Sequence, residues 1–125
     1  MKRVYVAHQL SAPTREGIDE NRRKAAMWGA WISTTFKVAV SADWLWMTGE
    51  LDETPENRAH GLACDLAHIE RCDELWMVGR VVSSGMRLEA EHARSHRIPV
   101  YDLTGYAADE HDIRRALSEQ RGGPP

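Results

Sequence analysis

Short apolar runs alternate with longer helical patterns along the chain. Four apolar segments predict buried strands, at residues 4–7, 37–41, 75–78 and 98–103. In four other segments the apolar residues recur at intervals of three and four and predict helices, at residues 15–32, 54 to about 71, 84 to about 94 and 109–120. Short apolar strands that alternate with helices are typical of an α/β fold, in which helices cover both faces of a parallel sheet.

Two of the predicted helices carry a carboxylate at the edge of their apolar stripe. Asp65 lies beside a stripe that includes Leu66, and Glu89 lies beside one that includes Ala90. An acid at this position is either half-buried and paired or directed into a cleft. Both carboxylates are therefore candidate functional groups.

Residues 42–53 follow neither the helical nor the strand period. Trp44 and Trp46 flank Leu45 in this stretch, which we expect to be a loop. Large aromatic side chains in a loop can form a lid over a ligand or a patch for a partner subunit. The sequence favours neither alternative.

The stretch at residues 82–93 begins with two serines and a glycine and continues as a helix. Ser83 or Ser84 is a good N-cap. The unpaired N–H groups of a helix N-terminus also attract anions, and small residues let an anionic group approach the backbone. An ordinary cap and an anion-binding site are thus both open interpretations.

The ends of the predicted strands should bring distant segments together. In parallel α/β sheets, ligands bind outside the carboxyl ends of the strands. Residues 5–9, 41–43 and 79–85 should therefore meet at one edge of the sheet. This convergence is the main structural prediction for the site.

Composition narrows the class of partner. The net charge is −3, from 16 basic and 19 acidic residues, without a basic block, which argues against polymeric nucleic acid. No apolar run approaches the ~20 residues of a membrane span, and the N-terminus does not have the pattern of a signal peptide. Cys64 and Cys72 do not suggest a disulfide framework, so we expect a cytoplasmic protein.

Six short segments together resemble the nucleoside 2-deoxyribosyltransferase superfamily, especially its small members and those similar to deoxynucleotide N-hydrolases. The resemblance spans roughly residues 3–103. It is carried by Val4-Tyr5-Val6-Ala7, Glu20-Asn21-Arg22-Arg23, Gly61-Leu62-Ala63-Cys64-Asp65, Cys72-Asp73-Glu74-Leu75, Ser84-Gly85-Met86-Arg87-Leu88-Glu89 with Ala93, and Ile98-Pro99-Val100. It implies one Rossmann-like or flavodoxin-like domain over residues 1–125, with four to five parallel strands and a frayed tail at 121–125.

The resemblance also implies roles for particular residues. Glu89, which stands four residues after Gly85 and four before Ala93, matches the family's nucleophile, Asp65 its helix-borne active-site acid, and Tyr5 its first-strand tyrosine. Ser83 and Gly85 match the residues that hold a 5′-phosphate in members that act on nucleotides. Neighbouring subunits close the sites of such proteins, so a homodimer or larger homo-oligomer is implied.

Further contacts with a ligand are expected from Ser84, from Asp43 at the sheet edge and from His8. The family commonly has a small residue in place of His8, and the deoxyribosyltransferases usually have glycine in place of Glu91. The departure at His8 is where specificity for the ribose or the base could differ.

The residue types suit cleavage of an N-glycosidic bond. A carboxylate beside C1′ can stabilise an oxocarbenium-like state and then trap the sugar covalently. Glu89 must be ionised for this, and we expect a position near the helix N-terminus to favour its charged form. Tyr5 could orient Glu89, and Asp65, if burial raises its pKa, could protonate the leaving base.

The sequence leaves hydrolase and transferase open, because either water or a second base can accept the sugar. The rival interpretation is a non-catalytic module that binds or senses a nucleotide-like ligand in the same cleft. A protein that uses its tryptophan-rich segment only for assembly is a third possibility.

No cofactor and no metal site are predicted. His60, Cys64 and His68 recur at every fourth residue of one helix, and His92 and His96 share this spacing on another. Histidines four apart on a helix can bind zinc. Neither set is a complete group of ligands in the sequence, and surface histidines are common.

Overall fold

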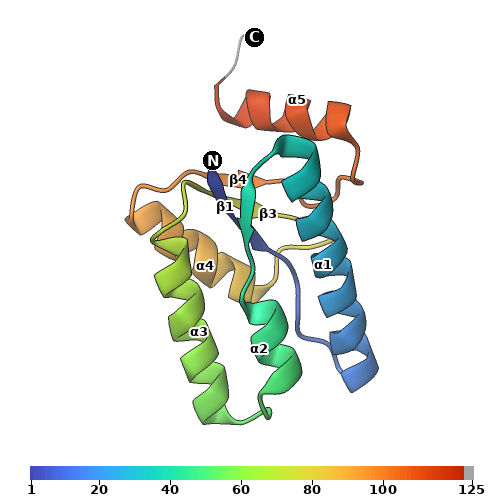
Figure 1. The fold of residues 1–125 in the computed structure, drawn as a ribbon, viewed down its shortest axis with the longest axis vertical. Helices are drawn as coiled ribbons and strands as arrows, with labels where there is room; N and C mark the ends of the chain where they lie inside the picture. Colours follow the sequence, from blue (N-terminus) through green and yellow to red (C-terminus); the bar gives the residue numbers. More distant parts are fainter. Residues whose placement is uncertain (123–125) are drawn as a thin grey trace.

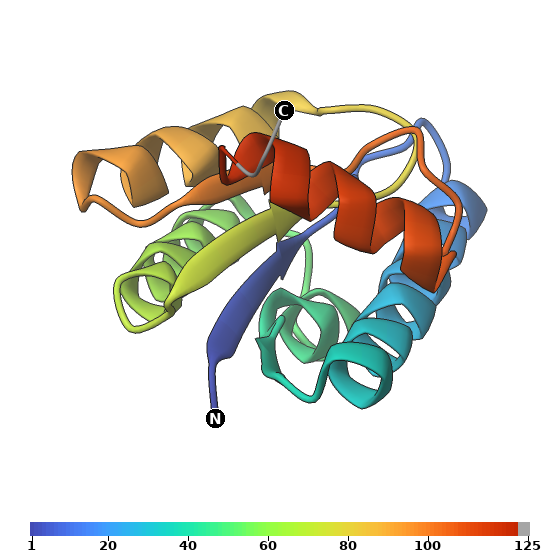
Figure 2. The ribbon, with the colours of Figure 1, turned by 90° about the horizontal axis from the view of Figure 1, so that it is seen from above.

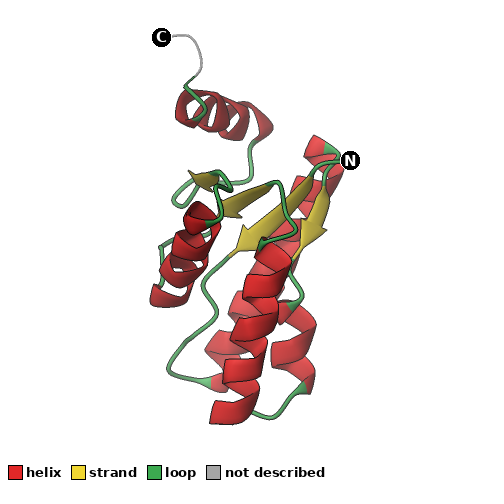
Figure 3. Ribbon diagram, turned by 90° about the vertical axis from the view of Figure 1, so that its left-hand side faces the viewer, coloured by secondary structure: helices red, strands yellow, loops and turns green. Residues whose placement is uncertain are grey.

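A parallel four-stranded sheet lies at the centre of the computed structural model, which describes residues 1–122 (Figures 1 and 3). Its strands are β1 (Arg3–Ala7), β2 (Ala39–Ser41), β3 (Glu74–Met77) and β4 (Val100–Asp102), in the order β2-β1-β3-β4. All three pairings are parallel, and the central strand β1 pairs with both β2 and β3. This arrangement confirms the predicted α/β class and is flavodoxin-like.

Helices cover both faces of the sheet (Figure 2). On one face, α1 (Arg15–Phe36) and α5 (Glu110–Gln120) pack against Val4, Val6 and Trp76. On the other face, α3 (Pro55–Ile69) and α4 (Ser84–Ser95) pack against Tyr5 and Leu75. None of the helices formed by residues 1–122 is long and apolar enough to cross a membrane. Successive side chains of β1 and β3 point to opposite faces of the sheet, so each helical layer packs on its own hydrophobic core.

Four helices begin at a polar side chain that accepts a backbone N–H group. These N-caps are Thr14, Thr54, Ser83 and Asp109. A cap of this kind satisfies one of the N–H groups that have no partner within the helix. The predicted helix starts at residues 54 and 84 therefore agree with the structure to within a residue.

Helix α1 extends four residues beyond its predicted end at residue 32. The sequence Ser33-Thr34-Thr35 suggested a break, but the hydroxyls bond to backbone carbonyls instead. Thr34 donates to the carbonyl of Ala30 at 2.8 Å, and Ser33 donates to the carbonyl of Val38 at 2.8 Å. The helix continues because these side chains find their partners without displacing its backbone bonds.

The prediction of a loop at residues 42–53 is wrong for most of the stretch, because Trp44–Glu50 form helix α2. Trp44 is buried, and its indole N–H donates to the carbonyl of Val6 at 3.3 Å. Trp46 points outward and is 57% exposed. Arg22 supports this helix from α1 by donating to the carbonyl of Leu45. A helix of only seven residues with one buried face is too short to show a clear helical period in the sequence.

The frayed tail predicted at residues 121–125 falls largely outside the described residues, which end at residue 122. Residues 121 and 122 form a turn after α5. Arg121 in this turn donates to the carboxylate of Glu74 at 2.7 Å. The contact ties the end of α5 to the beginning of β3.

A comparison of one buried leucine with one exposed leucine tests where the hydrophobic core lies. Leu75→Ala should lower the free energy of unfolding by about 3 kcal/mol, because Leu75 is fully buried on β3. Leu88→Ala should change it by less than about 0.5 kcal/mol, because Leu88 is 52% exposed on α4. Urea unfolding followed by circular dichroism measures both, and equal losses in the two variants would contradict this fold.

Candidate active site

A cavity of about 640 Å³ opens at the carboxyl ends of β1 and β3. Its lining comes from the segment after β1, from α2 and the connection that follows it, from α3 as far as Asp65, and from the N-terminal half of α4. His8, Asp65, Ser83, Ser84, Gly85 and Glu89 are among the lining residues. Most of the predicted convergence at this edge is therefore present, and the volume is within the usual range of small-molecule sites.

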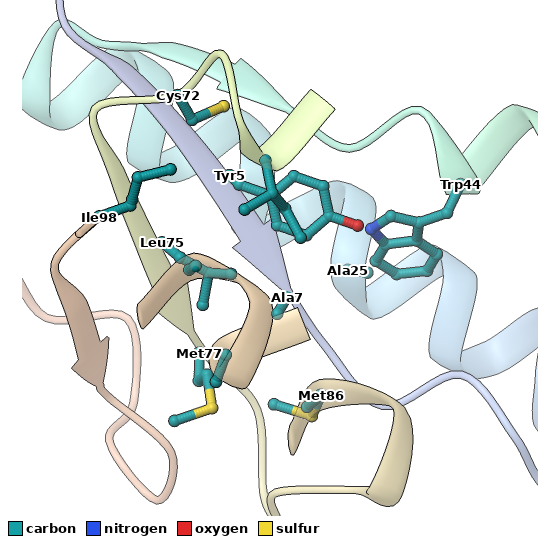
Figure 4. Close-up of a cluster of buried hydrophobic side chains, with 12 residues drawn as sticks. Tyr5, Ala7, Ala25, Trp44, Cys72, Leu75, Met77, Met86 and Ile98 are labelled. Carbon is teal, nitrogen blue, oxygen red and sulfur yellow. The ribbon is translucent and has the colours of Figure 1, made fainter. Parts of the chain in front are cut away.

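Glu89 accepts a hydrogen bond from the hydroxyl of Tyr5. Tyr5 is fully buried on the central strand, within the cluster of apolar side chains in Figure 4, and it does not line the cavity. Glu89 is 8% exposed and does line the cavity. The tyrosine thus holds the carboxylate from the side of the core, which is the contact that the sequence interpretation required.

Asp65 lies beside this pair on α3. Its Oδ1 atom is buried and has no hydrogen-bond partner among residues 1–122, although the side chain lines the cavity. A buried acceptor without a partner is costly unless a ligand, a water molecule or a proton satisfies it. The Oδ1 atom of Asp65 therefore needs a proton, a water molecule or a ligand atom that would satisfy it.

Burial changes the protonation of both carboxyls. It raises the pKa of Glu89 to about 8, and the charge of Asp65 adds to this, while the Tyr5 hydrogen bond acts in the opposite direction. Burial, together with the charge of Asp43, raises the pKa of Asp65 to about 7, against a lowering by the nearby Tyr5 hydroxyl. Burial and the charge of Glu89 raise the pKa of Tyr5 as well, so this phenol remains a hydrogen-bond donor.

The expectation that its helix position keeps Glu89 ionised is therefore wrong for the free protein. Glu89 is the sixth residue of α4 and lies beyond the first turn, where the helix dipole acts most strongly. Removal from water outweighs the dipole at this depth. For Asp65, the rise in pKa has the direction that a proton donor needs at neutral pH.

His8 forms part of the cavity wall next to Gly79. Its Nδ1 atom lies 2.7 Å from the carbonyl of Gln9, and burial lowers the pKa of its imidazole, which favours the neutral ring. Gly79 has a φ of +101°, and a Cβ atom there would stand 2.8 Å from Cδ2 of His8. Glycine at this position therefore allows the imidazole to occupy the space beside the end of β3.

Ser83 caps α4 at the cavity, where its hydroxyl oxygen accepts the N–H of Met86 at 3.3 Å. The capping interpretation is thus correct, and it is compatible with anion binding because the hydroxyl hydrogen can still be donated. A Cβ atom at Gly85 would contact only the Ser83 hydroxyl, at 4.0 Å. The backbone at this helix start is therefore open to a ligand.

Asp43 departs from its predicted role. Its carboxylate lies 2.8 Å from Nε2 of His68 on α3, and it is not among the residues that line the cavity. The strand end is where the sequence predicts it, but the following turn leads directly into α2 and directs Asp43 toward α3. Its effect on the site is the electrostatic one on Asp65.

Several lining residues were missed by the sequence interpretation. Arg58 and Leu62 line the cavity from the same helix as Asp65. Their spacing of three and four residues places all three on one side of α3, which is a signal present in the sequence. The contributions of Met47 and Thr48 could not be found, because they depend on the unpredicted helix α2.

The fold and the cavity define this chain as a flavodoxin-like α/β protein with two neighbouring carboxyls in a cavity at the carboxyl edge of its sheet. Residues 2–103 match a domain of unknown function, DUF7768, and the chain belongs to that family. Among solved structures it is similar to a 2-deoxyribosyltransferase from the psychrotolerant bacterium Bacillus psychrosaccharolyticus, described as a biocatalyst for nucleoside synthesis. The identity is 18%, the similarity covers 89% of each chain, and the TM-score of 0.60 shows a shared fold. No curated protein matches the chain.

The raised pKa of Glu89 predicts how stability depends on pH. The folded protein keeps this proton up to about pH 8, whereas the unfolded chain loses it near the ordinary value of 4.5. The free energy of unfolding should therefore fall as pH rises between these values. Glu89→Gln removes this titration while its amide oxygen can still accept the Tyr5 hydrogen bond. We expect the variant to be more stable than the wild type by about 2 to 4 kcal/mol above pH 8, and no more stable near pH 4.5.

Urea unfolding at the two pH values measures this difference. Glu91→Gln is the matched control, because Glu91 is exposed on the same helix and its substitution should leave the pH dependence unchanged. Parallel curves for the wild type and Glu89→Gln would refute the assignment of a buried, protonated Glu89.

Proposed function

We propose that this protein cleaves or transfers the N-glycosidic bond of a nucleoside or a nucleoside 5′-monophosphate. The observation that carries the proposal is that Glu89, held by a buried contact with Tyr5, lines the same cavity as Asp65. The 2-deoxyribosyltransferase of similar fold supports a nucleoside as the substrate class. We further propose that residues 1–125 act as one domain and that a second copy of the chain closes the site.

In the first step, the carboxylate of Glu89 attacks C1′ as the bond between C1′ and the base nitrogen breaks. Asp65 donates its proton to the departing base, so the base leaves neutral. The products are a free base and a glycosyl ester on Glu89. Tyr5 holds the attacking oxygens in place through its hydroxyl.

In the second step, an acceptor attacks C1′ of the ester and releases Glu89. Asp65, now a carboxylate, takes the proton of the acceptor. Water as the acceptor makes the protein a hydrolase, and a second base makes it a transferase. The reactive form has Glu89 ionised and Asp65 protonated. Because the pKa of Glu89 (about 8) is higher than that of Asp65 (about 7), this form is the less populated of the two singly protonated forms near neutral pH.

The N-terminus of α4 is the proposed site of the 5′-phosphate. Ser83, Ser84 and Gly85 border the cavity there and offer hydroxyl and backbone N–H donors. Arg58 borders the same cavity from α3, where its guanidinium is paired with Glu53 and would have to exchange this partner to bind a phosphate. The proposal assigns a contact with the sugar or the base to His8, which lies next to Gly79 and whose lowered pKa favours the neutral ring.

One observation favours a second function, a module that binds the same ligand without chemistry. Burial keeps Glu89 mostly protonated at neutral pH, and a protonated carboxyl is a hydrogen-bond donor rather than a nucleophile. Such a module would bind the nucleoside or nucleotide in the same cavity and release no base.

A panel of deoxynucleosides and deoxynucleotides, assayed for released base, separates the two functions. The wild type should release base, and Glu89→Gln should lower kcat by about 10³-fold or more while ligand binding persists, because only the nucleophile is lost. Glu91→Gln on the same helix should retain the wild-type rate. Binding without release by the wild type would favour the module, and release that persists in Glu89→Gln would refute the nucleophile.

The phosphate contact is tested by Ser83→Ala. The preference for the monophosphate over the nucleoside, measured as the ratio of the two kcat/KM values, should fall about tenfold when one charge-assisted hydrogen bond is lost. Thr14→Ala is the matched control, since it removes the N-cap of α1 away from the cavity. An unchanged ratio in Ser83→Ala would refute the phosphate contact.

A further inference from the structure

A group of side chains that could bind a metal ion lies away from the cavity, where the C-terminal ends of α3 and α4 meet (Figure 1). Glu70 is the C-cap of α3, and His92 and His96 occupy the last turn and the C-cap of α4. Each offers one ligating atom, and these three atoms lie within 4.8 Å of one another. The three residues therefore face a common point from two helices.

The separations within this group suit a single small cation. Nε2 of His92 lies 2.9 Å from Oε2 of Glu70, and Nε2 of His96 lies 3.7 Å from Oε1. Bonds of about 2.0–2.2 Å to a tetrahedral Zn²⁺ place neighbouring ligand atoms about 3.3–3.5 Å apart. The observed separations lie on both sides of this value, so small rotations of the exposed side chains would complete the geometry.

The ring of His96 is already oriented for coordination. Its Nδ1 atom lies 2.9 Å from the backbone carbonyl of His92. A carbonyl oxygen only accepts hydrogen bonds, so this contact favours the tautomer with the proton on Nδ1, which leaves the lone pair of Nε2 toward Glu70. A backbone carbonyl that holds the second ring nitrogen is the usual outer partner of a metal-binding histidine.

We propose that Glu70, His92 and His96 bind a divalent transition-metal ion of the Zn²⁺ type, with water in the fourth position. Two imidazoles and one carboxylate favour Zn²⁺ and its neighbours over Mg²⁺ and Ca²⁺, which prefer oxygen ligands. None of the three residues lines the cavity. The ion therefore acts as a structural link between α3 and α4.

The link has a consequence for the site. Glu70 follows Asp65 by five residues on α3, and His92 follows Glu89 by three on α4. An ion that joins the ends of the two helices limits their relative movement and thereby the separation of the two carboxyls. This effect on positioning does not depend on which reaction the cavity performs.

The experiment is a titration of the untagged, metal-free protein with Zn²⁺, followed by calorimetry and thermal unfolding. One equivalent should bind with a Kd below about 10 μM, and a hundredfold excess over Kd should raise Tm by about 10 °C. Co²⁺ in place of Zn²⁺ should give the visible absorption bands of a four- or five-coordinate site. Mg²⁺ at the same concentration should not raise Tm.

Variants locate the ion. His92→Ala and His96→Ala should each weaken Zn²⁺ binding more than about 100-fold, because the loss of a ligand exceeds the 10- to 100-fold effect of losing an outer partner. Glu70→Gln should weaken it as well. Glu70 and His96 are exposed and His92 is half-buried, so the Tm of the metal-free variants should stay close to that of the wild type.

The control is the double variant His60→Ala/Cys64→Ser, which removes a different pair of potential ligands on α3, whose Nε2 and Sγ atoms lie 3.5 Å apart. It should bind Zn²⁺ as the wild type does. A Kd above about 10 μM for the wild type, or binding that persists in His96→Ala and is lost in the control, would overturn the proposal.

Discussion

The pairing of β1 with β3 is the constraint on which the rest of the structure depends. It places Tyr5 opposite Leu75 in the middle of the sheet and sends the chain in opposite directions at the ends of the two strands. The gap between the diverging connections is where ligands bind in this class of fold. Because Tyr5 is fixed by the core on the same face, its hydroxyl provides a rigid support for Glu89.

The burial of the two carboxyls in the site is unfavourable for the stability of the fold. Two carboxyls with raised pKa values lie close together, and one of them has a buried oxygen without a partner among the described residues. Buried polar groups of this kind reduce stability and recur at functional sites, where a ligand or a proton relieves the cost. The well-packed clusters on the two faces of the sheet are the compensation.

Helices α3 and α4 carry most of what distinguishes this protein. One side of each contributes to the cavity through Asp65 and Glu89, and their C-terminal ends bring Glu70 against the histidines. Both features depend on how these helices pack against each other and against the sheet. A chain with the same sheet but a different angle between them would keep the fold and lose both sites. The fold shared with the 2-deoxyribosyltransferase at 18% identity is consistent with a scaffold that tolerates extensive change of sequence.

The sequence by itself determined the α/β class, the four strands and the helix starts, because these follow from local periodicity and from capping residues such as Thr54 and Ser83. It also placed Glu89 and Asp65 at the edges of apolar stripes. Only the tertiary structure decided that Trp44 lies in a helix, that Asp43 turns away to His68, and that burial raises the pKa of Glu89. Each of these depends on burial and on neighbours from distant segments. For the same reason the sequence did not indicate Glu70, the third ligand of the proposed metal site, which lies 22 residues before His92 in the chain and 2.9 Å from it in space.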